Sequence, residues 1–130
     1  MIASDVATRE GIDNTPSFEI VRNLEELCDN LLQPMREAWG APINVTSGYR
    51  CKELNKKVGG VSMSAHTLGY ACDLQTKNFS KFVEFATKWL KDKAFDQCII
   101  EKSGNTTWLH LGIRNNKGEQ RRQFLNITKK

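Results

Sequence analysis

The chain has 130 residues, of which 39% are hydrophobic and 26% are charged, and these values are typical of one globular domain with a modest core. We therefore expect a single domain over residues 1–130, and because no run of about 18 apolar residues occurs, we expect no membrane span. The formal net charge of +4 suits a partner with negative charge, but the basic residues are scattered and accompany no recognition motif, which argues against a nucleic-acid partner.

The first ten residues are polar and lack the apolar stretch of a secretory signal, so we expect synthesis in the cytoplasm without a signal peptide. In that compartment free thiols are more common than disulfides. The cysteines show no CxxC spacing, which argues against a cysteine-based metal site. They are Cys28, Cys51, Cys72 and Cys98.

The N-terminal part of the chain predicts a lead-in followed by one long helix. Residues 1–22 are rich in turn signals and are expected to lie over the domain, with at most one short helix. Over residues 24–39, apolar side chains recur at steps of three and four, which is the helical period. Asn23 is the expected N-cap, and Pro34 should kink the helix or split it at Gln33.

Short elements alternate through the middle of the chain. In order, we expect a strand at residues 43–46, a helix at 51–58, a loop at 62–66, a strand at 71–74 and a helix at 80–91 with Ser80 as its cap.

The C-terminal part of the chain predicts strands. Residues 97–101 and 108–113 flank a segment rich in turn residues and should pair as a hairpin, and residues 124–127 should form a last edge strand. The whole order predicts an α+β fold in which helices pack on one antiparallel sheet that ends in an antiparallel meander.

The chain has only two histidines, and each lies in a segment suited to chemistry. His66 follows a small polar loop, and Asp73 lies seven residues after it in a strand-like run. His110 lies on the second hairpin strand, on the face opposite to Leu109 and Leu111. Two imidazoles and one carboxylate would leave a fourth position open, as catalytic zinc sites do. The alternative is that each histidine is an ordinary surface or core side chain.

Several short motifs near these residues occur together, and they resemble the zinc D-alanyl-D-alanine metallopeptidases. That family includes cell-wall carboxypeptidases and phage L-alanyl-D-glutamate endolysins, with the hedgehog signalling domain as a distant relative, and the resemblance implies their shared fold. It covers roughly residues 11–113. The motifs are Ser47-Gly48-Tyr49-Arg50, Leu54-Asn55, Val58-Gly59-Gly60, Ser64-x-His66-x-x-Gly69-x-Ala71-x-Asp73 and Trp108-x-His110.

The resemblance implies a role for each matching residue. His66, Asp73 and His110 correspond to the ligands of one zinc ion per chain. Arg50 matches an arginine that faces the substrate and would bind a carboxylate or stabilise an oxyanion; its alternative is a structural ion pair. Substrate contacts are also expected from Ser64 and Trp108.

The catalytic base departs from the commonest pattern of the family. Many members carry an acid three residues before the last histidine, where this chain has Thr107. Hedgehog-like members place a glutamate across the hairpin turn instead, and Glu101 matches that position as a cross-strand neighbour of Trp108 or His110. A surface hairpin glutamate is the alternative, and Asp96 would then be the next candidate base.

The resemblance implies hydrolysis of an amide bond in peptidoglycan stem peptides. Either a D,D-carboxypeptidase or an endopeptidase is possible, and the short chain favours a cleft open at both ends. The alternative from a different class is a non-catalytic zinc-bearing domain that binds wall peptides or a protein partner. We expect a monomer that acts on the cell wall after release from the cytoplasm, as a phage, prophage or bacterial enzyme.

Overall fold

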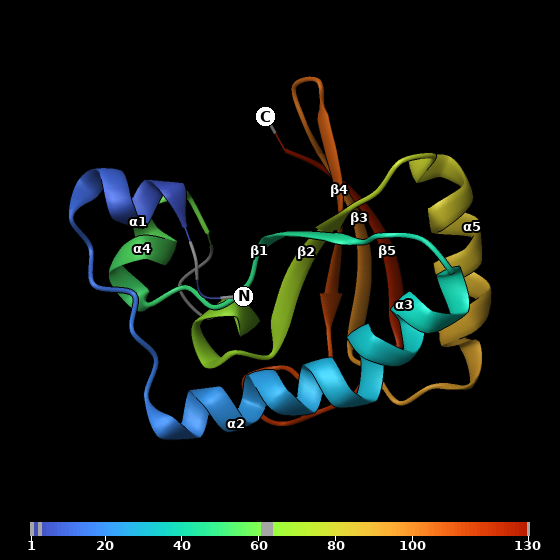
Figure 1. Ribbon diagram of the computed structural model, residues 1–130, viewed down its shortest axis with the longest axis horizontal. Helices are drawn as coiled ribbons and strands as arrows, with labels where there is room; N and C mark the ends of the chain where they lie inside the picture. Colours follow the sequence, from blue (N-terminus) through green and yellow to red (C-terminus); the bar gives the residue numbers. More distant parts are fainter. Residues whose placement is uncertain (1, 3, 61–63, 130) are drawn as a thin grey trace.

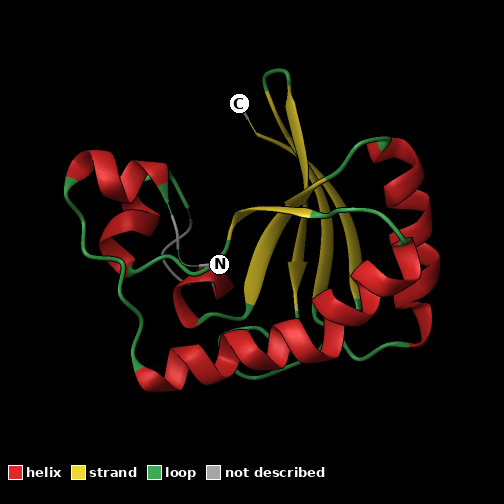
Figure 2. Ribbon diagram, in the orientation of Figure 1, coloured by secondary structure: helices red, strands yellow, loops and turns green. Residues whose placement is uncertain are grey.

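The fold consists of one five-stranded sheet with helices around it (Figure 1, Figure 2). The computed structural model describes residue 2 and residues 4–60 and 64–129. The α-helices are α1 Asp5–Glu10, α2 Phe18–Leu27, α3 Gln33–Trp39, α4 Lys52–Lys57 and α5 Phe79–Trp89. The other helical turns are η1 Cys28–Leu32, η2 Ala65–Leu68 and η3 Leu90–Asp92. The strands are β1 Asn44–Ser47, β2 Ala71–Gln75, β3 Gln97–Ser103, β4 Thr106–Gly112 and β5 Gln123–Lys129.

The sheet has the strand order β1-β2-β4-β3-β5, and the predicted α+β class is confirmed. The hairpin of β3 and β4 also forms as predicted, with Glu101 directly opposite Trp108. The predicted antiparallel meander is wrong for the last strand, because β5 pairs with β3 in parallel. One edge of β4 is already paired with β2, so the free edge of the hairpin belongs to β3. The segment after β4 returns along the end of the sheet, and β5 starts beside Gln97.

The long helix begins earlier than the prediction. It starts at Phe18, because the Ser17 hydroxyl caps it by accepting a hydrogen bond of 3.3 Å from the Ile20 amide. Asn23, the predicted cap, is inside the helix, where its side-chain amide donates to the Leu68 carbonyl at 2.8 Å. The predicted lead-in therefore ends at Ser17, and its one short helix is α1.

Pro34 distorts the helix locally but does not break it. The turn η1 before it is π-helical, and the Gln33 amide donates to the carbonyl of Cys28, five residues back. A proline lacks the N–H group of a regular helix and its ring crowds the carbonyl four residues earlier. The widened turn gives that ring room, so the helix continues as α3 until Gly40.

Two smaller predictions are also corrected. Helix α5 begins after Asn78, whose carbonyl accepts from the Lys81 and Phe82 amides, so Ser80 lies inside the helix and is not its cap. The segment before His66 was expected to be a loop throughout; residues 65–68 form a 3-10 turn, and residues 62 and 63 lie outside the described residues.

The core lies between one face of the sheet and the helices. Figure 1 shows α3 and α5 packed together beside the sheet, while α1 and α4 lie on the other side, beyond β1. Leu109 and Leu111 of β4 point into the core, and Cys72 lies there with them. The opposite face of the sheet carries the side chains of the candidate functional site. None of the helices in the described ranges has the length and apolar character needed to cross a membrane.

Gly69 ends the turn that carries His66 and packs closely against Ile20 of the long helix. It has φ of 75°, and a Cβ atom there would lie 3.0 Å from both Ile20 Cγ2 and the Ile20 carbonyl oxygen. Gly40 has a similar φ of 78° but open space around it. Gly40→Ala should therefore cost only backbone strain, about 1–2 kcal/mol, whereas Gly69→Ala should add about 1–3 kcal/mol of overpacking.

Urea denaturation of the two variants measures this difference. Equal losses of unfolding free energy in Gly40→Ala and Gly69→Ala would contradict the close packing of Gly69 on Ile20.

Candidate metal centre

His66 is held by backbone contacts on both sides. Its amide donates to the Ser64 hydroxyl at 3.2 Å, and its carbonyl accepts from the Arg50 amide at 3.0 Å. Its ring Nδ1 donates to the Gly48 carbonyl at 2.7 Å, which leaves the Nε2 lone pair free to bind a metal. The ring is only 2% exposed, and this burial lowers the pKa of His66, which favours the neutral form that metals require.

Asp73 and His110 come from neighbouring strands and are direct cross-strand partners in the pairing of β2 with β4. Asp73 Oδ1 lies 3.3 Å from His110 Nδ1 and 3.3 Å from His66 Nε2. Burial alone would raise the pKa of Asp73, but the neighbouring imidazoles of His110 and His66 outweigh burial and lower it. The carboxylate is therefore ionised and ready to act as a ligand.

The spacing of these three side chains is compatible with binding of one shared metal ion. Their ligand atoms all lie within 4.8 Å of one another. Ligands about 2.0–2.2 Å from a tetrahedral zinc ion lie about 3.3–3.5 Å apart, whereas good N–H···O bonds are about 2.7–3.2 Å long. Cys72 lies in the core on the opposite face and takes no part in this group.

Glu101 lies beside this group. Its Oε1 is 3.7 Å from His110 Nδ1, and the residue is only 7% exposed. The register predicted from the hairpin thus places a carboxylate next to the metal ligands. Asp96, the alternative base, is instead bound by the Arg121 guanidinium through two hydrogen bonds of 2.7 and 2.8 Å.

Arg50 supplies a half-buried cation near Asp73 and Glu101. Burial lowers the pKa of its guanidinium, while the charges of Asp73 and Glu101 raise it. Its Nε is buried and makes no hydrogen bond within the described part of the chain. A buried donor of this kind needs a partner, and a substrate oxygen can provide one.

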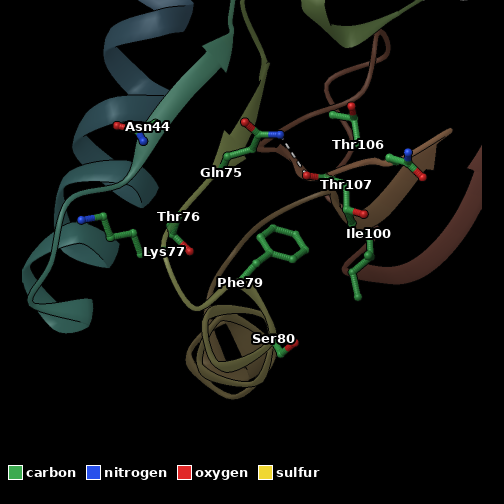
Figure 3. Close-up of a pocket in the computed structure, with 10 residues that line it drawn as sticks. Asn44, Gln75, Thr76, Lys77, Phe79, Ser80, Ile100, Thr106 and Thr107 are labelled. Carbon is green, nitrogen blue, oxygen red and sulfur yellow. Dashed lines mark hydrogen bonds between the residues drawn. The ribbon is translucent and has the colours of Figure 1, made fainter.

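Two cavities are lined by residues of the candidate site. A cavity of about 390 Å³ is lined by Arg50 and by residues of the lead-in, and another of about 180 Å³ is lined by Ser64 and His110. A larger cavity of about 830 Å³ lies elsewhere, around Phe79 and Thr107 at the hairpin end of the sheet (Figure 3). Cavity size alone therefore does not identify the site. The site is identified by side chains whose chemistry suits a metal ion.

The structure adds contacts that residue types could not reveal. The acceptor for His66 is the carbonyl of Gly48, and a backbone carbonyl leaves no signature in the sequence. The lead-in is a wall of the larger of the two cavities at the candidate site, although its sequence shows only turn signals. The Asp96–Arg121 pair lines the smaller one, and its 25-residue separation gave no reason to connect the two side chains.

Comparison with known proteins agrees with this geometry. The model of the family described as Peptidase M15 matches residues 1–112. The chain belongs to the peptidase M15 family. Among curated proteins, the zinc D-Ala-D-Ala carboxypeptidase of Streptomyces albus G is 50% identical over 44 residues. That alignment covers 33% of this chain and 17% of the relative, so the chain spans under a fifth of the relative's length.

The M15 match includes every residue of the ligand group together with Arg50 and Glu101. It ends at the last residue of β4, so the segment that lines the 180 Å³ cavity with Asn116 and Arg121 lies outside it. The part of the chain that holds the group is thus the part shared with M15 peptidases.

Removal of one ligand should weaken metal binding strongly. We expect Asp73→Ala to lower the affinity for Zn²⁺ by more than about hundredfold, because loss of a mere supporting contact already costs about 10- to 100-fold. Isothermal titration with Zn²⁺, supported by metal analysis after gel filtration, measures this.

Asp29→Ala is the matched control, because Asp29 is an exposed acid on η1, remote from the group, and its removal should leave binding unchanged. Full zinc binding by a folded Asp73→Ala protein would rule out the assigned ligands.

Proposed function

We propose that the chain is a zinc-dependent peptidase that hydrolyses an amide bond in peptidoglycan stem peptides. The observation that carries the proposal is the juxtaposition of three side chains able to bind a metal with a buried carboxylate, Glu101, and a half-buried guanidinium, Arg50. Membership of the M15 family and the name of the Streptomyces relative support zinc and the peptide chemistry.

His66 Nε2, Asp73 Oδ1 and His110 Nδ1 would hold one zinc ion per chain. Three protein ligands leave a fourth position for substrate or water, as in catalytic rather than structural zinc sites. When bound, zinc lowers the pKa of water toward about 7 and polarises a carbonyl oxygen.

Glu101 is the proposed general base and acid. Its carboxylate accepts the proton from the attacking water and then gives that proton to the nitrogen of the leaving amine. Burial beside His110 keeps the carboxylate within reach of the reacting atoms. Asp96 is unsuited to this role because Arg121 occupies both of its carboxylate oxygens.

Arg50 is proposed to donate hydrogen bonds to the oxygen on which negative charge develops, or to a substrate carboxylate. Its free Nε–H and its burial suit this role, because a pre-oriented donor in a dry site stabilises charge strongly. Ser64 and Trp108 are proposed to contact the substrate backbone on the other side of the ligands.

The cavities at Arg50 and Ser64 favour an endopeptidase over a carboxypeptidase. A substrate chain that extends beyond the cleaved bond in both directions could use both the cavity at Arg50 and the cavity at Ser64. A carboxypeptidase needs only a closed pocket for one terminal residue, and the similarity to a D-Ala-D-Ala carboxypeptidase supports that second choice.

We also propose that the enzyme acts as a monomer, since one chain supplies all three ligands. Its proposed place of action is the cell wall, which it reaches after release from the cytoplasm by a phage, a prophage or a bacterium.

Digestion of purified peptidoglycan tests the function. Mass spectrometry should find peptide cuts that chelator abolishes and added zinc restores. Cuts inside the stem or its cross-link indicate an endopeptidase, and loss of one terminal D-alanine indicates a carboxypeptidase. A zinc-loaded protein that binds muropeptides and leaves them uncut would be the non-catalytic domain instead.

Glu101→Gln separates chemistry from metal binding. The variant should keep its zinc and lose at least about a hundredfold in kcat, because general acid–base catalysis contributes about 10²–10⁴-fold. Glu53→Gln, at an exposed acid of α4, is the control and should remain active. Full activity of Glu101→Gln would place the base elsewhere.

A further inference from the structure

The 390 Å³ cavity beside Arg50 contains a feature that the proposed reaction does not use. Its walls come from the start of the lead-in, from the end of β1 and from the residue after α4. Asp5 and Arg50 are the two charged residues that line it. Within the described residues no ion pair joins them, so both charges remain available to a ligand lying between them.

The same cavity offers apolar surface near its negative charge. Val6 and Val58 line it, and Val58 is 40% exposed. A carboxylate next to branched aliphatic side chains suits a ligand with a short methylene chain that ends in an ammonium group, because methylenes pack on apolar surface while the charged end stays near the opposite charge.

The lead-in that carries Asp5 is held in place by partly buried hydrogen bonds. Asn14 donates to the Tyr49 carbonyl at 3.0 Å and accepts from the Cys51 amide at 2.8 Å, which ties the lead-in to the residues on both sides of Arg50. The Ser4 hydroxyl accepts from the Ala7 amide at 3.2 Å and fixes the turn that contains Asp5. This wall is therefore a built part of the cleft.

We propose that this cavity binds the side chain of the diamino acid in the stem peptide, with its ammonium group at Asp5. The inference rests on the proposed function and identifies the part of the substrate that selects the cleavage site. Arg50 remains directed at the reacting oxygen or at a carboxylate of the same residue. Asp5 is a specificity-determining residue in this account and takes no part in bond cleavage.

Two synthetic stem peptides that differ only in the diamino acid test the proposal. One carries a lysine with a free side-chain amine, and the other carries the same lysine acetylated. The native enzyme should cleave the free-amine peptide with a severalfold higher kcat/KM, about three- to tenfold, because the ion pair is partly exposed and screened.

Asp5→Asn should bring that ratio of kcat/KM values close to one. Glu10→Gln removes the same charge from the other end of α1, where Glu10 pairs with Lys57 outside the cavity, and it should keep the ratio of the native enzyme. A ratio near one in the native enzyme, or an undiminished ratio in Asp5→Asn, would overturn the proposal for Asp5 while leaving the peptidase intact. Failure of the zinc-loaded native enzyme to cut either peptide or whole peptidoglycan would overturn the proposed function itself.

Discussion

The register between β2 and β4 is the constraint on which the site depends. Asp73 lies directly opposite His110 in that pairing, and both side chains emerge on the same face of the sheet. A slip by one residue would exchange Asp73 for Cys72 or Leu74, because successive side chains of a strand point to opposite faces. The register is fixed by burial: Cys72, Leu74, Leu109 and Leu111 are all fully buried on the other face. Because side chains alternate between the two faces of β2 and β4, the same register places apolar residues in the core and polar residues at the site.

His66 completes the group from outside the sheet, and its position depends on packing of a different kind. The turn that carries it rests on the long helix through the close approach of Gly69 to Ile20 and through the bond from Asn23 to Leu68. The Gly48 carbonyl then orients the imidazole and selects the nitrogen that faces Asp73. These supporting contacts matter for a metal site because a loosely held ligand binds weakly.

Much of the candidate site was predictable because its residue types are rare in this chain. Two histidines and a nearby aspartate suggested the ligands, and the family resemblance singled out Glu101, which the hairpin register places opposite Trp108. The start of the long helix was not predictable, since Ser17 and Asn23 are both good caps and only the tertiary contact of Asn23 decides between them. The parallel pairing of β5 was missed for a similar reason, because local sequence does not say which edge of a hairpin is free.

The lead-in shows how a segment without regular periodicity can still shape a site. Its turn residues predict only an irregular path, yet Asn14 binds the backbone on both sides of Arg50 and brings Asp5 to the cleft. Under the proposed role of Asp5, a mutation in this segment changes substrate choice without altering a candidate metal ligand. The division is a common one in enzymes, in which a rigid sheet holds the reacting groups and connecting segments select the substrate.

One carboxylate and two imidazoles, with no sulfur, are proposed to hold a zinc ion that keeps an open position. X-ray absorption spectroscopy of the zinc-loaded protein tests this arrangement most directly. The account predicts nitrogen and oxygen neighbours at about 2.0–2.2 Å, with imidazole scattering from two histidines and no shell at the zinc–sulfur distance of about 2.3 Å. A sulfur shell, or a set of four protein ligands, would contradict it.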